Sequence, residues 1–164
     1  MAELVLAIVG VAGTLTAGIV GSLLQRKTQE RVERLQHQRR TTDQQAASLQ
    51  QFARYVVDYR RAQLVVWYQV EDGRQRGEMT NADTAPASAE MRQARSESWT
   101  WYYAVRLVWG DDDVVSGAAA LLDRCSDLQR ASNEEQLNVA SDAILDSLNA
   151  LVDKARKVLT HRDQ

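Results

Sequence analysis

The predicted fold rests on residues 132–161, which read SNEEQLNVASDAILDSLNALVDKARKVLTH. Their apolar side chains recur at steps of three and four, which is the spacing of one face of an α-helix. Ser132 and Glu135 match the S-x-x-E capping box of a first helical turn. The sequence therefore predicts a helix over 133–161 that buries one stripe, made of Leu137, Ala140, Ile144, Leu148, Leu151, Ala155 and Val158.

Three further helices are predicted over residues 46–131 by apolar spacing of the same kind. The first ends near residue 71, before a loop-forming stretch that holds two glycines and Pro86. Proline is favoured in the first turn of a helix, so the second is expected to begin at Pro86. Three aspartates, residues 111–113, precede the third helix. We expect these carboxylates to cap free N–H groups, because no histidine lies nearby to complete a metal site.

These helices make residues 46–164 a domain with one longer loop and two short connections. Short connections place successive helices antiparallel, so an up-down-up-down four-helix bundle is the expected closure. No alternation of strand type competes, and the expected fold class is all-α. The predicted helices cover residues 46–71, 86–109, 112–131 and 133–161.

Residues 1–24 contain the most apolar run of the chain, because residues 4–24 carry no charge. A helix that crosses a bilayer needs about 20 predominantly apolar residues, so this run predicts a single transmembrane helix. A secretory signal would begin with a basic segment, whereas only Met1, Ala2 and Glu3 precede the run. The alternatives left open are a buried central helix of a soluble bundle and a cleaved leader.

Residues 25–45 are polar on every face and predict a helical stalk. Basic residues concentrate on the cytoplasmic side of membrane spans, so the C-terminal domain is expected in the cytoplasm and the N-terminus outside the cell membrane. Because the cytoplasmic lipid surface is negatively charged, the basic side chains of the stalk are expected to contact it. These are Arg26, Lys27, Arg31 and Arg34.

Small residues gather on one face of the predicted span, opposite a face of large aliphatic side chains. Small residues four apart let helix backbones approach closely in lipid, which predicts self-association or pairing with another membrane helix. Glycine is also generally frequent in membrane helices, so an incidental composition is the alternative. The expected packing residues are Gly10, Gly13, Thr14, Ala17, Gly18 and Gly21.

An aromatic cluster in the second predicted helix allows two interpretations. The side chains form an aromatic core whose polar atoms reach the rim, or they form a surface that binds a soluble protein partner. The residues of this candidate partner patch are Trp99, Trp101, Tyr103 and Trp109.

Catalytic, metal and cofactor motifs are missing from the sequence, and we expect neither an enzyme nor a cofactor. The net charge of −2 and the lack of a continuous basic stripe in the bundle argue against nucleic-acid binding. Residues 25–45 are basic overall and residues 111–164 are acidic overall. This asymmetry is compatible with a membrane anchor and with charge-complementary packing between subunits.

The sequence therefore predicts a single-pass membrane scaffold or assembly subunit that forms homo-oligomers partly through its span. The first alternative is a membrane-perturbing or pore-forming effector whose bundle controls assembly of the spans. The second is a membrane-tethered module that binds a partner through the aromatic surface. Seventeen arginines against three lysines suggest a bacterial source with a GC-rich genome.

Overall fold

The computed structural model describes the backbone of residues 2–162 and the side chains of residues 29, 32, 33 and 36–161. Within these residues the chain forms four α-helices and no strand, which confirms the predicted all-helical fold. The chain divides into two units, Met1–Thr41 and Thr42–Gln164. In chain order the elements are α1 (Ala2–Gln75), α2 (Ser88–Val108), α3 (Asp112–Asp127), the 3₁₀ turn η1 (Leu128–Arg130) and α4 (Glu134–Arg162).

The described residues of the first unit lie within helix α1. The predicted span at 4–24, with its packing face from Gly10 to Gly21, lies outside the residues whose side chains are described. The same holds for Arg26, Lys27, Arg31 and Arg34 of the stalk, so these assignments stay predictions. In the part of the chain that the structure describes, no helix is both long enough and apolar enough to cross a membrane.

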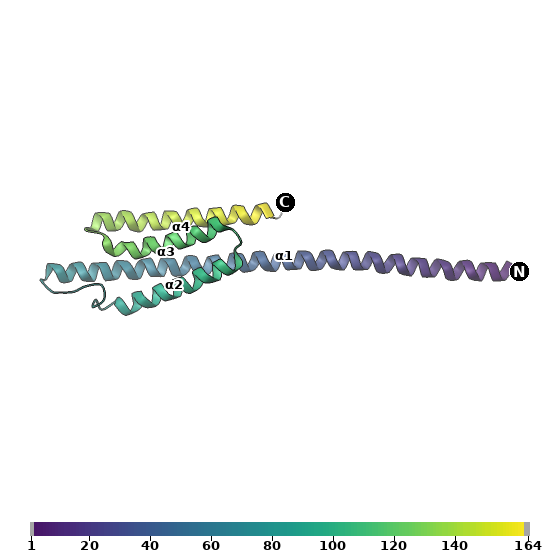
Figure 1. Ribbon diagram of the computed structural model, residues 1–164, viewed down its shortest axis with the longest axis horizontal. Coiled ribbons are helices and arrows are strands. Elements are labelled where there is room, and N and C mark those ends of the chain that lie inside the picture. Colours follow the sequence, from purple (N-terminus) through teal and green to yellow (C-terminus); the bar gives the residue numbers. More distant parts are fainter. Residues whose placement is uncertain (1, 163–164) are drawn as a thin grey trace. The chain divides into compact units, whose positions relative to one another are not determined.

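The second unit is an antiparallel bundle built from the end of α1 together with α2, α3 and α4 (Figure 1). Side-chain hydrogen bonds join α1 to each of the other three helices. The Ser98 hydroxyl of α2 donates to the Tyr55 carbonyl at 2.9 Å, and the hydroxyls of Tyr59 and Ser126 lie 3.1 Å apart. Arg60 donates to the carbonyl of Ser141 on α4 at 3.0 Å. All four helices therefore share one interior.

That interior is apolar and receives large side chains from every helix. Its only cysteine, Cys125, is fully buried on α3, and burial raises the pKa of the thiol to about 12. The stripe predicted for the last helix supplies one wall of the core. Its fully or nearly fully buried members are Leu137, Ile144, Leu148, Leu151 and Ala155.

Helix α4 starts one residue later than the predicted capping box implies. The side-chain oxygen of Asn133 accepts the N–H of Gln136 at 2.9 Å, and the Gln136 side chain accepts the N–H of Ser132 at 3.1 Å. Asparagine caps a helix as well as serine does, so the cap is Asn133 with Gln136 rather than Ser132 with Glu135.

The aspartate cap predicted for the third helix is confirmed at Asp111, whose carboxylate accepts the N–H of Val114 at 3.0 Å. This helix ends earlier than predicted, because residues 128–130 tighten into a 3₁₀ turn. Helix α2 begins at Ser88, two residues after Pro86, and the N–H of its N-cap residue Ala87 donates to the Gln69 side chain of α1 at 2.9 Å.

Helix α1 also runs beyond its predicted end near residue 71, because only the second glycine of the loop stretch stops it. Gly73 remains inside the helix, where a β-carbon would lie only 2.6 Å from the Thr80 hydroxyl. Gly77 has a φ of 75°, and the N–H of Glu78 donates to the Gly73 carbonyl at 2.8 Å. This pattern is a Schellman motif, in which glycine takes the left-handed conformation.

Substitution of Gly77 by alanine is expected to lower the free energy of unfolding by about 1–2 kcal/mol, the cost of a left-handed β-carbon-bearing residue. Nothing lies within 4 Å of the added methyl group, so the loss is conformational rather than steric. Urea unfolding followed by circular dichroism measures it. The control Gln75→Ala, at the last helical position, should leave stability nearly unchanged; equal losses in both variants would contradict the assignment.

Candidate interaction surfaces

Trp109 of the predicted partner patch lies in the core, with 3% of its surface exposed. Its indole N–H donates to the carbonyl of Gln45 at 3.1 Å and approaches the Ser48 hydroxyl at 3.3 Å. A buried tryptophan with a satisfied N–H is a packing residue. For Trp109 the burial therefore supports the first interpretation, an aromatic core, over a partner-binding surface.

Gln45 was expected at the end of the solvated stalk, but the structure buries it within the bundle, with 2% of its surface exposed. Its side-chain amide donates to the carbonyl of Val108 at 2.8 Å, and the Ser48 hydroxyl donates to the Gln45 carbonyl at 2.9 Å. Buried polar groups need such partners. Sequence reasoning missed Gln45 because a glutamine among polar residues gives no sign of burial.

The other three aromatic residues of the patch lie at the surface of α2 to different degrees. The ring of Trp101 stacks on Tyr55 of α1, with centroids 6.1 Å apart and an angle of 13° between planes. Trp99 is half-buried and packs edge-on against Tyr102 at 5.3 Å. Tyr103, by contrast, has 52% of its surface exposed. Trp101 therefore joins two helices, whereas Trp99 and Tyr103 remain accessible from outside the bundle.

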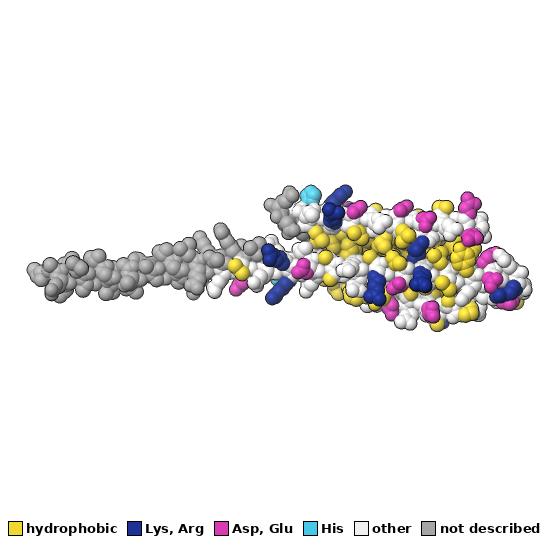
Figure 2. Space-filling model, turned by 180° about the vertical axis from the view of Figure 1, so that it is seen from behind, with side chains coloured by type: hydrophobic (Ala, Val, Ile, Leu, Met, Phe, Trp, Pro, Cys, Tyr) yellow, Lys and Arg dark blue, Asp and Glu magenta, His cyan; other side chains and the backbone are white. Residues whose placement is uncertain are grey.

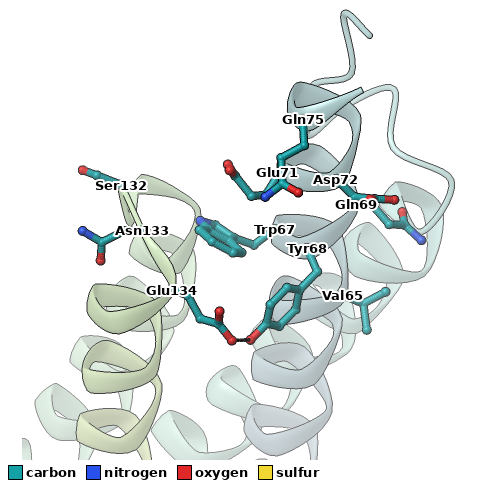
Figure 3. Close-up of a pocket in the computed structure, with 10 residues that line it drawn as sticks. All are labelled: Val65, Trp67, Tyr68, Gln69, Glu71, Asp72, Gln75, Ser132, Asn133 and Glu134. Atoms are coloured by element: carbon teal, nitrogen blue, oxygen red, sulfur yellow. Dashed lines mark hydrogen bonds between the residues drawn. The ribbon is translucent and has the colours of Figure 1, made fainter. Parts of the chain in front are cut away.

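A cleft of about 730 Å³ opens between the end of α1 and the start of α4 (Figure 3). The Tyr68 hydroxyl donates to the Glu134 carboxylate at 3.1 Å across it, and this hydrogen bond raises the pKa of Tyr68. The Trp67 indole N–H donates to the Ala131 carbonyl at 2.9 Å. The lining residues are Val65, Trp67, Tyr68, Gln69, Glu71, Asp72, Gln75, Ser132, Asn133 and Glu134.

The acidic groups at this cleft are largely paired with neighbouring side chains. Glu71 accepts from Arg74 at 2.6 Å, and Asp72 lies 2.9 Å from Arg76. Within the described part of the chain, no group of three histidine, cysteine, aspartate or glutamate residues is placed to hold a metal ion. The hydrogen bonds of Trp67 and Tyr68 fasten the end of α1 to Ala131, in the connection before α4, and to Glu134, the first residue of α4.

Residues 46–159 match the family described as KilB plasmid transfer protein. The chain belongs to this family. No curated protein and no solved structure matches the chain. The family description suggests a bacterial protein. The matched residues begin at the first turns of the bundle and end within α4, so the KilB family region is the bundle itself.

The KilB family region also carries an apolar groove of about 400 Å³ between α1 and the end of α4. Figure 2 shows hydrophobic side chains gathered along this junction. Leu49 and Ala53 line it from α1, while Val152 and Leu159 line it from α4. Arg156 is the one charged residue among those that line the groove. The small alanine side chains of α1 leave this gap, because they do not fill the space between the two helices.

Proposed function

We propose that the protein is a membrane-anchored helical subunit of a bacterial plasmid-transfer apparatus, in which the bundle acts as a scaffold on the cytoplasmic side. The observation that carries the proposal is the family match, which spans residues 46–159 and so coincides with the folded bundle. The uncharged run at 4–24 and the basic residues after it support an anchor with this orientation.

A scaffold role fits the chemistry of the bundle better than catalysis does. Its buried polar groups, such as Gln45, Ser98 and Ser141, lie in contacts between helices. The cleft between the end of α1 and the start of α4 is bridged by the hydrogen bond from Tyr68 to Glu134. The outer surface and the apolar groove between α1 and α4 remain available to other molecules, which suits assembly with a partner.

Plasmid transfer between cells tests the proposal directly. Disrupting the gene on its plasmid should abolish or strongly reduce the transfer frequency, and the intact gene supplied separately should restore it. A gene that encodes the bundle without residues 4–24 should fail to restore transfer even when the protein accumulates. Normal transfer without the gene would contradict the proposal, and leakage of a dye from cells that express the intact chain would favour a membrane-perturbing effector instead.

The proposed assembly through the span is tested by crosslinking in native membranes. The variant Gly13→Leu/Ala17→Leu/Gly21→Leu fills the small-residue face with bulky side chains that keep helix backbones apart, so its crosslinked oligomers should diminish relative to wild type. Leu4→Ile/Leu15→Ile, on the bulky face, is the matched control and should behave as wild type. Monomeric migration of the wild type itself would exclude self-association through the span.

A further inference from the structure

The outward side of α2 combines basic and aromatic side chains. Arg92, Arg95 and Arg106 are exposed and share one side of the helix with Trp99, Tyr103 and Leu107. Leu107 is 86% exposed, an unusual position for so large an apolar side chain when nothing covers it. None of the three arginines forms an ion pair with another residue whose side chain is described. We call these six residues the α2 outer face.

The outward side of α4 has the opposite charge. Glu135, Asp142, Asp146 and Asp153 are exposed and lie on one side of the helix, and no basic residue occurs between positions 134 and 153. Val139 lies among them with 66% of its surface exposed. None of these four carboxylates is ion-paired with another described side chain. We call these five residues the α4 outer face.

The two faces also match in the spacing of their charges. Arg95 and Arg106 are 11 residues apart, and so are Glu135 and Asp146, and Asp142 and Asp153. At a rise of about 1.5 Å per residue, each of these separations is about 16 Å along its helix. Between their charges, the α2 outer face presents aromatic rings and the α4 outer face presents Val139. Helices laid side by side would therefore pair charges at both ends and bury apolar surface between them.

We propose that the α2 outer face of one copy of this chain binds the α4 outer face of a second copy. The occupant is a second copy because the chain itself carries both complementary surfaces. A two-fold pair that makes this contact twice closes as a dimer, whereas a pair that makes it once is heterologous and leaves one face of each kind open. Repetition then yields a ring or an open row of bundles. This inference goes beyond the proposed function, since it requires neither the span nor plasmid transfer.

Charge reversal of each face tests the contact in the full chain, solubilised in a non-ionic detergent. All measurements use the Gly13→Leu/Ala17→Leu/Gly21→Leu background, so that association through the span does not contribute. The α2 variant is Arg92→Glu/Arg95→Glu/Arg106→Glu, and the α4 variant is Glu135→Lys/Asp142→Lys/Asp146→Lys/Asp153→Lys. Light scattering at low and high salt reports the protein mass, and circular dichroism confirms that each variant is helical.

The parent chain, which carries only the three leucine substitutions in the span, is expected to form oligomers. These should dissociate as the salt concentration rises, because salt screens exposed charges. Each reversed variant alone should stay at the mass of one chain, 18.4 kDa for the native sequence. An equimolar mixture of the two should associate again, since one variant presents only acidic faces and the other only basic ones. The control Arg54→Glu/Arg61→Glu, which changes exposed charges of α1, should associate like the parent.

Three results would overturn the proposal. The first is a parent chain that is monomeric at low salt. The second is a mixture of the helical variants that fails to associate. The third is loss of association in only one of the two variants, which would mean that a single face, not the pair, forms the contact. A transfer defect in cells would not change the meaning of these three results. The proposed contact and the proposed function are therefore tested independently.

Discussion

Substitution of Trp109 by alanine is expected to lower the free energy of unfolding by about 3–5 kcal/mol, the range observed when buried tryptophan or phenylalanine is truncated. The side chain is almost wholly buried and joins the end of α2 to α1 through the Gln45 carbonyl. Alanine would leave a cavity at this junction and remove the indole donor. Urea unfolding followed by circular dichroism at 222 nm gives the midpoint and slope from which the loss is calculated.

Tyr103→Ala is the matched control for this measurement, because both positions were assigned to the same candidate patch. Tyr103 is more than half exposed, and surface substitutions usually change stability by less than about 0.5 kcal/mol. The loss of unfolding free energy in Tyr103→Ala should therefore be several-fold smaller than that in Trp109→Ala. Similar losses at the two positions would show that the burial of α2 differs from the arrangement described above.

Introduction of two aspartates into the apolar run, as Ile8→Asp/Leu15→Asp, is expected to release the chain from the membrane fraction. Each aspartate at the centre of a membrane helix costs about 2.5–3.5 kcal/mol on the insertion scale, whereas a large aliphatic residue contributes favourably. Two such changes should be enough to prevent stable insertion. Fractionation of cells, followed by an alkaline carbonate wash of the membranes, measures the retained share.

The variant Ile8→Leu/Leu15→Ile keeps the apolar character of the run and should remain in the washed membranes. A wild-type chain that carbonate extracts would contradict a membrane-spanning anchor. So would an aspartate variant that stays in the membrane fraction to the same extent as wild type. Either outcome would return residues 4–24 to the alternative of a helix buried in a soluble assembly.

Residue patterns predicted the helices well because each helix of the bundle buries one stripe. The spacing of Leu137, Ile144, Leu148 and Leu151 alone indicates the buried side of α4, and all four are buried. The ends of the helices were harder to predict from the sequence, since several residues near each end are able to cap the helix. Asn133 competes with Ser132, and Gly77 competes with Gly73, and packing in three dimensions selects between them.

The aromatic patch shows where sequence reasoning stops. The residue pattern could place Trp99, Trp101, Tyr103 and Trp109 on one predicted helix. It could not tell which of these side chains are buried and which are exposed. The separation depends on which neighbours cover each ring. Tyr55 of α1 covers Trp101, and Gln45 with Ser48 receives Trp109, while Tyr103 lies mostly exposed.

By itself, the sequence determined that the chain is helical and which stripe of α4 is buried, because helical periodicity is a local property of the residues. Only the tertiary structure decided that Gln45 and Trp109 form a buried junction, and that α2 and α4 present oppositely charged outer faces. The reason is that burial depends on contacts between residues distant in the sequence. Gln45 and Trp109 are 64 positions apart, and no local pattern connects them.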